Sequence, residues 1–418
     1  AGIIRQLIVL FTGAGKTFIL IRLLEKMGFK RVLWLSFQEE LVVQTAMAFI
    51  KDKFDESFYN KVEEMGFLEY LKKDSSFPDN FKLGCIKADL FLSDANVVMG
   101  SVMTVTKRLN ALPPDYFDCI ICDEAHLFAS ISAVNVLNHF SPKLLIGATA
   151  TPTRADGLPL SDIFQKITFE YNLLEGIKDG YACEMDAVKV KTNVSLDKVK
   201  TTAGEFNLKD LTNEVNTLAR NQLIVDSYKK YCLERPCIAF CVDIQHAMDL
   251  AEQFRLNGFN CMAVSSNEEL TPGRSENIKK YKDLKLNIIT NVNILVAGFD
   301  MVDTGCIIMA APTKSITKYL QAVGRGSRLK NKWYVDKFSQ NCTIIDIVDN
   351  TSRHNLVNAW ELDREKDVED RVFVSREKKD KLLAERQRKA FITHERKEDE
   401  IVKLLALPRL KVNKWMPG

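Results

Sequence analysis

Short apolar runs alternate with longer amphipathic segments over residues 1–155. The runs are rich in Val, Ile and Leu and do not alternate strictly with polar positions, which is typical of strands buried on both faces of a parallel sheet. Five runs are expected to be strands, at residues 5–11, 31–36, 96–100, 119–122 and 144–147. Helical periodicity lies between them, including residues 17–27 and 39–51. The pattern therefore predicts an α/β unit in which helices cover a parallel sheet.

The same rhythm resumes after residues 156–173, which contain Gly157 and Pro159 and are expected to connect two units. Expected strands follow at residues 237–241, 261–264, 288–291, 306–310 and 342–347. Expected helices lie at residues 244–257 and 315–323. The chain is thus predicted to hold a second α/β unit of similar size over residues 174–350.

Two segments depart from this alternation of apolar runs and amphipathic segments. Residues 351–418 are dense in charges of both signs, which predicts an exposed helical extension packed on the second unit; a tail that holds DNA or a partner is the alternative. Residues 51–82 carry seven aromatic side chains. This insert is predicted to be a small packed helical excursion, with a strand-separating element as the alternative.

Composition fits a folded chain and says little about its partner. With 418 residues the chain has room for two to three domains of roughly 150 residues each. It is 46% hydrophobic and 27% charged, which excludes a disordered or fibrous protein. Because the formal net charge is only +3, a surface that binds nucleic acid would have to be local.

Ten cysteines lie within apolar segments, and no apolar run approaches the roughly 20 residues that span a bilayer. Such cysteines are expected to be reduced and buried, which predicts a cytoplasmic protein without a membrane partner. Cys119 and Cys122 form a CxxC pair, but no second pair of zinc ligands lies nearby, so both are assigned to the core. The first residue is Ala1, and we expect the native N-terminus to lie upstream.

The strongest chemical signal is a hexapeptide that follows an expected strand and precedes an expected helix, as a phosphate-binding loop does. Glycines allow the backbone N–H groups to face phosphate oxygens, a lysine adds positive charge, and a hydroxyl can bind Mg²⁺. The pattern predicts nucleotide contacts from Thr12, Gly13, Ala14, Gly15, Lys16 and Thr17. Leu10 stands where the general motif has its first glycine, and the alternative is a glycine-rich helix start without a ligand.

Two carboxylates end the expected strand at residues 119–122, in the sequence Asp123-Glu124-Ala125-His126. The carboxyl end of a parallel strand faces the crevice where ligands bind. Asp123 is predicted to hold Mg²⁺ with Thr17, mainly through water. Glu124 is predicted to orient or deprotonate the water that attacks the γ-phosphate.

A third motif lies in the second unit. Arginines placed across a cleft can stabilise the charge of a phosphoryl-transfer transition state, with a gain of about 10³–10⁵ in rate. Arg325 and Arg328 are predicted to do this, and Gln321 to position the water. Alone, this stretch would be interpreted as the start of a surface helix, and its pairing with the other two motifs favours the functional interpretation.

In this order, the three motifs resemble those of superfamily 2 helicases of the DEAH type. Five further segments resemble motifs of that family: Ia at residues 35–41, Ib at 100–104, III at 147–154, IV at 238–241 and V at 298–300. The resemblance covers about residues 5–350. It implies two tandem RecA-like domains with ATP and Mg²⁺ bound between them.

The resemblance also implies roles for residues outside the three motifs. Gly298 and Asp300 would contact the nucleotide, and His126, Thr149 and Thr151 would couple the nucleotide side to the nucleic-acid side. Contacts with a nucleic-acid backbone are implied for Ser36, Gln38, Ser101, Thr104 and Thr290.

Residues 150–157, 174–180 and 312–328 resemble a narrower group most strongly. It comprises phage UvsW-type branch-migration helicases, including those of T5-like phages, bacterial RadD and the motor subunits of some restriction enzymes. This implies a monomeric ATP-dependent DNA helicase that remodels Holliday junctions or forks in recombination and repair, in the cytoplasm of a bacterium or a phage-infected cell. Phe11 departs from the Pro frequent in this group, and the group's upstream adenine-reading Gln motif is not visible.

Three alternatives stay open at this point. The chain could be the motor part of a restriction system or a DEAH-type RNA helicase, because contacts with a phosphate backbone do not distinguish the sugars. It could also be an ATP-gated clamp without hydrolysis. A clamp would not need Glu124, Gln321 and both arginines together, which favours an enzyme.

Overall fold

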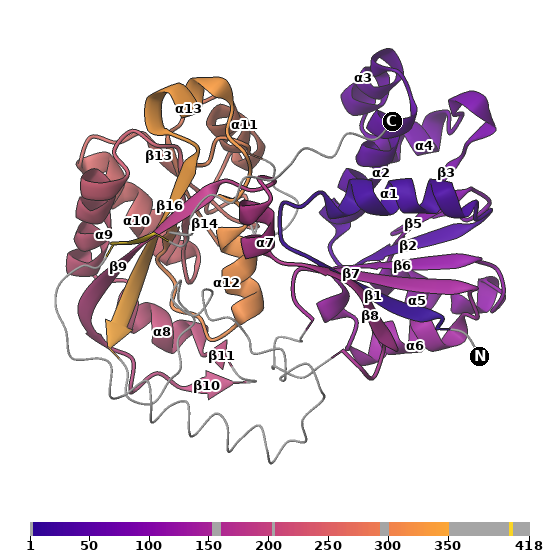
Figure 1. Cartoon of the computed structure of the whole chain (residues 1–418), viewed down its shortest axis with the longest axis horizontal. Coiled ribbons are helices and arrows are strands. Elements are labelled where there is room, and N and C mark those ends of the chain that lie inside the picture. The colour runs from indigo at the N-terminus through magenta and orange to yellow at the C-terminus, as the bar shows by residue number, and fades with distance from the viewer. Residues whose placement is uncertain (1–2, 153–159, 203–204, 293–300, 351–400, 404–418) are drawn as a thin grey trace.

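The computed structural model describes residues 3–152, 160–202, 205–292, 301–350 and 401–403. It contains two tandem domains, each a mostly parallel sheet with helices on both faces (Figure 1). The predicted class, an α/β chain with two RecA-like units, is confirmed. Within the described ranges, no helix is both long and apolar enough to cross a membrane.

The first domain is built on an eight-stranded sheet of order β4-β3-β5-β2-β6-β7-β1-β8. Its neighbouring strands are parallel except for β3 and β4, which form an antiparallel hairpin. The strands are β1 Arg5–Leu10, β2 Val32–Ser36, β3 Leu83–Lys87, β4 Leu90–Leu92, β5 Val97–Ser101, β6 Cys119–Asp123, β7 Leu144–Thr149 and β8 Lys166–Tyr171. All five predicted strands of this unit are present, with ends shifted by at most two residues.

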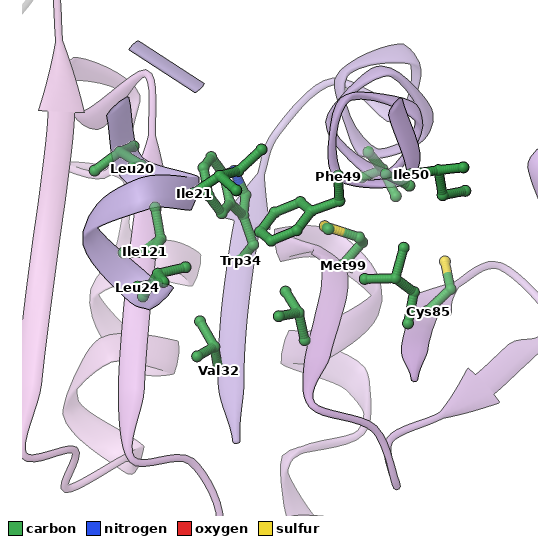
Figure 2. Close-up of a cluster of buried hydrophobic side chains, with 14 of the residues drawn as sticks. Leu20, Ile21, Leu24, Val32, Trp34, Phe49, Ile50, Cys85, Met99 and Ile121 are labelled. Atoms are coloured by element: carbon green, nitrogen blue, oxygen red, sulfur yellow. The ribbon is translucent and has the colours of Figure 1, made fainter. Parts of the chain in front are cut away.

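Helices cover both faces of this sheet. Side chains from α1 to α4 pack on one face with Trp34 and Phe49, whose rings meet edge to face at 5.6 Å (Figure 2). Side chains from α5 and α6 pack on the other face. The helices are α1 Lys16–Met27, α2 Glu39–Lys53, α3 Glu56–Met65, α4 Phe67–Lys73, α5 Val102–Lys107 and α6 Ile131–His139, with short 3-10 turns at Pro78–Asn80, Leu109–Ala111 and Ala125–Leu127.

The insert at residues 51–82 folds as a helical excursion. It contains α3 and α4, and its aromatic rings contact one another, including Phe54 with Phe58 at 5.0 Å and Tyr70 with Phe77 at 5.6 Å. Tyr70 is fully buried. Aromatic side chains that pack together in this way support the domain core, as the packed-excursion prediction states.

The second domain is built on a sheet of order β13-β14-β12-β15-β16-β9-β17, parallel except for β17 against β9. Its strands are β9 Glu184–Ser195, β12 Cys237–Phe240, β13 Cys261–Val264, β14 Ile288–Asn291, β15 Cys306–Met309, β16 Asn341–Asn350 and β17 Ile401–Lys403, and a small hairpin joins β10 Thr201–Thr202 to β11 Glu205–Phe206. The helices are α7 Leu173–Lys178, α8 Leu208–Val215, α9 Leu218–Tyr231, α10 Ile244–Leu256, α11 Arg274–Lys282, α12 Ile316–Val323 and α13 Lys332–Phe338. Side chains of α9 and α10 pack on one face, and those of α7, α11 and α12 on the other.

Three sequence expectations need correction. The connection expected at residues 156–173 contains β8, which joins the first sheet as the parallel neighbour of β1. β9 was missed because buried and exposed positions largely alternate along it, so it lacks the continuous apolar run that marked the other strands. The charged helical extension predicted for residues 351–418 lies outside the described residues except for 401–403, which form β17 rather than a helix.

All ten cysteines are buried free thiols, in agreement with the core role expected for Cys119 and Cys122. Burial raises the pKa of the Cys119 thiol to about 12, so it stays neutral at physiological pH. Among the described residues, no group of three or more His, Cys, Asp or Glu side chains is arranged to hold a metal ion. Both thiols of the CxxC pair are buried among the apolar side chains of the first domain.

A buried ion pair joins α9 to the end of β16 in the second domain. The Arg220 guanidinium donates from Nε and Nη2 to the two Asp349 carboxylate oxygens, at 2.9 and 2.7 Å. Both side chains are almost fully buried, at 1% and 0% exposure. The Thr192 hydroxyl also donates to Asp349, at 2.6 Å. One carboxylate thus fixes a helix and two neighbouring strands, β16 and β9.

Replacing Asp349 by asparagine is expected to destabilise the second domain by about 3–5 kcal/mol, because it leaves the arginine buried without its counter-charge. Urea denaturation followed by circular dichroism would show this loss as a lower midpoint. The matched control is Glu276→Gln, which removes an exposed pair with Lys280 and is expected to leave the urea midpoint nearly unchanged. Equal, small effects of both substitutions would contradict the structural role of Asp349.

Candidate nucleotide site between the two domains

The loop between β1 and α1 has the backbone geometry of a phosphate cradle. Gly13 and Gly15 adopt positive φ angles of 100° and 78°, which favour glycine. A Cβ built at Gly15 would meet nothing within 4 Å, so the space beside the loop is open. Gly15 is the N-cap of α1, and the helix dipole favours an anion at this end. Residues 12–17 therefore fit the triphosphate for which the sequence predicts them.

Lys16 and Glu124 form an ion pair at the mouth of this loop. Lys16 Nζ lies 3.2 Å from Glu124 Oε1, and the two side chains are only 12% and 14% exposed. Glu124 adopts a left-handed backbone conformation, with φ 53° and ψ 56°. Such strain in a non-glycine residue costs about 1–3 kcal/mol and is found mostly where function requires a fixed side chain.

The neighbouring carboxyl groups of Asp123 and Glu124 ionise differently. Burial, reinforced by the negative charge of Glu124, raises the pKa of Asp123 to about 6. Burial also opposes ionisation of Glu124, but Lys16 and other positive groups outweigh it and lower its pKa. Glu124 is thus kept ionised beside Lys16, whereas at Asp123 the charge of the same lysine only partly offsets burial and the negative charge of Glu124.

The hard oxygen donors at this site fit Mg²⁺, which binds one or two carboxylates together with phosphate oxygens and water. Asp123 ends β6, and Thr17 lies in the first turn of α1. Asp123 is only 7% exposed and lies next to the negatively charged Glu124, so its ionised form is one that a bound cation would stabilise. The residues present therefore fit the ion that the sequence analysis assigns to them.

The second domain contributes α12 and the turn that follows it. Gln321 Nε2 lies 3.5 Å from Glu124 Oε2, which is a long hydrogen bond between the two domains. Burial lowers the pKa of Arg325 to about 10, although the charge of Glu124 opposes this effect. Burial also lowers the pKa of Arg328. Both arginines remain cationic at neutral pH.

The backbones of the two domains approach each other closely beside the phosphate loop. The Ser327 hydroxyl donates to the Thr12 carbonyl at 3.1 Å. A Cβ built at Gly324 would lie 2.4 Å from the Thr12 Cβ, and one built at Gly13 would lie 3.0 Å from Ser327 Oγ and 3.7 Å from Arg328 Cγ. Glycine at positions 13 and 324 therefore permits the close approach that brings the arginine segment to the loop.

A chain of buried polar contacts runs from Glu124 toward the second domain. His126 Nδ1 lies 3.4 Å from Glu124 Oε2 and 3.1 Å from Thr149 Oγ1. The Thr151 N–H donates to the same Thr149 oxygen, and the Thr151 hydroxyl lies 2.8 Å from the Thr317 hydroxyl on α12. The three coupling residues of the sequence analysis, His126, Thr149 and Thr151, thus lie in one connected network.

The residues expected to contact nucleic acid differ in how exposed they are. Gln38 is exposed, and Thr104 is half-buried and accepts a hydrogen bond from the Ala88 N–H. Ser36 and Ser101 are buried, at 0% and 2% exposure, so their hydroxyls do not face solvent in this structure.

Thr290 requires correction, because its hydroxyl is fully buried and donates to the Ala247 carbonyl at 2.7 Å. A side chain used in this way packs α10 on β14, so it is not available to a nucleic-acid backbone. Gly298 and Asp300, the two expected nucleotide contacts of motif V, lie outside the described residues.

Phe11, Thr317 and Ser327 are structural contributors that the motifs did not reveal. Phe11, a departure from the resembling group, packs its ring against Gly176 of α7 and belongs to the core of the second domain. A Cβ built at Gly176 would lie 2.4 Å from this ring. The signal available in the sequence was the unusual Phe itself; Thr317 and Ser327 gave none, since their contacts lie in another domain.

Two family profiles match the chain, one in each domain. Residues 3–154 match "Type III restriction enzyme, res subunit", and residues 222–330 match "Helicase conserved C-terminal domain". Among curated proteins, IRC3 of Saccharomyces cerevisiae, provisionally described as an ATP-dependent helicase, is 32% identical over 284 residues, covering 65% of this chain and 40% of IRC3. The type I restriction enzyme EcoAI endonuclease subunit of Escherichia coli is 26% identical over 361 residues, covering 79% of this chain and 42% of the subunit.

Solved structures share the fold at low identity. A fragment provisionally assigned as the HsdR subunit of a type I restriction enzyme from Vibrio vulnificus YJ016 has a TM-score of 0.58 and 21% identity, covering 85% of this chain and 66% of the fragment. The restriction-modification enzyme LlaBIII bound to DNA has a TM-score of 0.55 and 15% identity, covering 84% and 27%. Dbp5 of S. cerevisiae bound to RNA has a TM-score of 0.51 and 13% identity, covering 83% and 80%.

The chain spans about 40% of the length of the first curated relatives that it matches. The resemblance to UvsW-type helicases and RadD stays a prediction, because the relatives named above are IRC3 and a restriction enzyme subunit. The restriction-subunit profile on the first domain and the helicase profile on the second, in this order, indicate a superfamily 2 helicase, an enzyme of the ATPase/helicase class.

Proposed function

We propose that the chain is an ATP-driven DNA helicase or translocase that acts on branched DNA. The observation that carries the ATPase part is the convergence of Lys16, Glu124 and Gln321 from two domains within hydrogen-bonding distance. A binding clamp would gain nothing from an ionised base held against a glutamine of the opposite domain. This arrangement suits hydrolysis of a phosphoanhydride by an activated water.

The roles follow from the geometry. When the triphosphate takes up Lys16, Glu124 loses that partner and can accept a proton from the attacking water. Gln321 lies close enough to Glu124 to orient the same water, and Arg325 and Arg328 approach with the charge that the transition state requires. Thr17 and Asp123 would hold Mg²⁺, whose charge neutralises the phosphate oxygens when it is bound.

Hydrolysis changes the contacts between the domains, since part of the hydrolytic set lies on α12 of the second domain. Closure and opening of such a cleft convert chemistry into relative domain motion. The segments around Gln38 and Thr104, at the carboxyl ends of β2 and β5, are proposed to hold a nucleic-acid backbone. Alternate gripping by two domains then moves the protein along a strand.

DNA is the proposed substrate because both the EcoAI subunit and LlaBIII are named as restriction enzymes, and LlaBIII was solved bound to DNA. Branched DNA suits a small motor. Opening a DNA step costs about 1.4 kcal/mol on average, and at a migrating junction each broken pair is replaced by a new one. A monomeric two-domain engine in the cytoplasm of a bacterium or phage-infected cell would suffice.

A second candidate is the motor part of a restriction enzyme. The match of residues 3–154 to a restriction subunit profile and the likeness to the HsdR fragment favour it. In that case the nuclease would reside in another part of the protein or in a partner. The RNA-bound Dbp5 structure makes RNA a further outcome to test.

Glu124→Gln is expected to bind ATP and to lower ATP turnover at least a hundredfold, because the amide cannot accept the proton of water. Turnover and equilibrium nucleotide binding should be measured on the same protein. The control Glu63→Gln alters an exposed helix carboxylate of the first domain and should leave turnover unchanged. Wild-type turnover in Glu124→Gln would show that another group is the base.

Arg328→Ala is expected to cut turnover at least a hundredfold and to leave ATP binding nearly intact, since the cation is required mainly in the transition state. Steady-state kinetics gives kcat and KM, and nucleotide binding gives the ground-state affinity. Lys332→Ala, an exposed cation a few residues on, serves as the control. Equal losses of affinity and turnover would instead identify a ground-state phosphate contact.

ATP turnover is expected to rise most with four-way-junction DNA, compared with single-stranded DNA, duplex DNA and RNA of matched length. Glu124→Gln serves as the blank, so contaminating ATPases are subtracted. Strongest stimulation by plain duplex DNA would favour the restriction motor. Strongest stimulation by RNA would leave only the superfamily assignment.

A further inference from the structure

We infer that Thr317 is a positioning residue that holds α12 at the distance from Glu124 required for hydrolysis. The inference rests on the proposed ATPase activity. Thr317 lies outside the three motifs of the sequence analysis and carries none of the roles assigned above. Its hydroxyl forms a buried contact across the two domains, on the same helix that carries Gln321.

The contact between Thr317 and Thr151 is short, and both residues are buried. The Thr317 and Thr151 hydroxyl oxygens lie 2.8 Å apart, and each residue is only 3% exposed. Either hydroxyl can donate. A buried hydroxyl that loses its partner is unfavourable, so the pair favours the docked arrangement of the two domains.

The helix transmits this position to the hydrolytic centre. Thr317 and Gln321 are four residues apart on α12, so they lie on the same face of the helix. Gln321 reaches Glu124 at 3.5 Å. The end of α12 also leads directly to Arg325, whose charge acts on Glu124.

On its other side α12 is fixed to its own domain. The buried Tyr319 hydroxyl donates to Asp346 of β16 at 2.8 Å. The Ser315 hydroxyl caps the helix by accepting from the Lys318 N–H. The helix therefore moves with the second domain, and the Thr317 contact sets the position of that domain against Thr151.

On the first-domain side, Thr151 is connected through Thr149 and His126 to the Glu124 carboxylate. Thr151 is tied through its N–H to Thr149 Oγ1, which lies 3.1 Å from His126 Nδ1. His126 in turn lies 3.4 Å from Glu124 Oε2. The contact between Thr151 and Thr317 thus connects two routes to Glu124, one through Thr149 and His126 and one through α12 and Gln321.

The consequence is a selective effect on the chemical step. A shift of about 1 Å in a catalytic group can lower the rate by up to about a hundredfold. Phosphate binding depends on residues 12–17, which do not involve Thr317. Loss of the hydroxyl should therefore lower kcat and leave KM for ATP nearly unchanged.

The test uses Thr317→Val, which keeps the shape and removes the hydroxyl, and Thr317→Ser, which keeps the hydroxyl. ATP turnover is measured with saturating nucleic acid. Thr317→Val should lower kcat at least tenfold with KM within twofold of wild type, and Thr317→Ser should recover kcat to within threefold. Thr151→Val should match Thr317→Val, and the double variant should be no slower than either, because one contact is lost in all three.

Thr168→Val is the matched control, since the Thr168 hydroxyl bonds the Leu7 carbonyl within the first domain. Wild-type kcat in Thr317→Val, additive losses in the double variant, or no recovery in Thr317→Ser would overturn the inference. So would a fall in kcat matched by an equal rise in KM. If wild-type protein hydrolyses ATP and Glu124→Gln does not, these failures would concern Thr317 alone; no turnover in wild type would instead overturn the proposed function.

Discussion

The ion pair between Lys16 and Glu124 is the contact on which the arrangement of the site depends. Two carboxyl groups end β6 in a buried position, and a buried charge is tolerated only when it is paired. Lys16 supplies the pair from the phosphate loop and Gln321 reaches the same carboxylate from the other domain. The structure thus brings three separate segments of the chain to one carboxylate, and a phosphate group that competes for Lys16 would change all of them.

The domain junction is built from close backbone approach and a few hydroxyl contacts. Gly324 against Thr12, and Gly176 against the Phe11 ring, leave no room for a Cβ. The polar contacts are Ser327 with Thr12 and Thr317 with Thr151. Contacts of this kind define one docked position of the two domains, and the proposed cycle of cleft closure and opening would break and re-form them.

Strands buried on both faces were predictable because each carries a continuous apolar run, as at β2 and β6. β9 was missed because its alternating pattern has no such run, and β8 because its side chains are almost all exposed and only pairing with β1 defines it. The glycine turn before α1 and the position of Asp123 and Glu124 at the end of β6 were predictable for a similar reason, since local backbone geometry favours their residue types. Thr290 was expected to contact nucleic acid, but a threonine can pack a helix on a strand as readily as it can contact a ligand.

The class of fold, the glycine turn at residues 12–17 and the acidic pair at the end of β6 could be predicted, because each depends on residues adjacent in the chain. The approach of Gln321 and Arg325 to Glu124, the entry of Phe11 into the core of the second domain and the contact of Thr317 with Thr151 could be seen only in the folded structure. These residues lie far apart along the chain. Contacts between residues 166 or more positions apart leave no local periodicity, and they form only when two separately folded sheets dock.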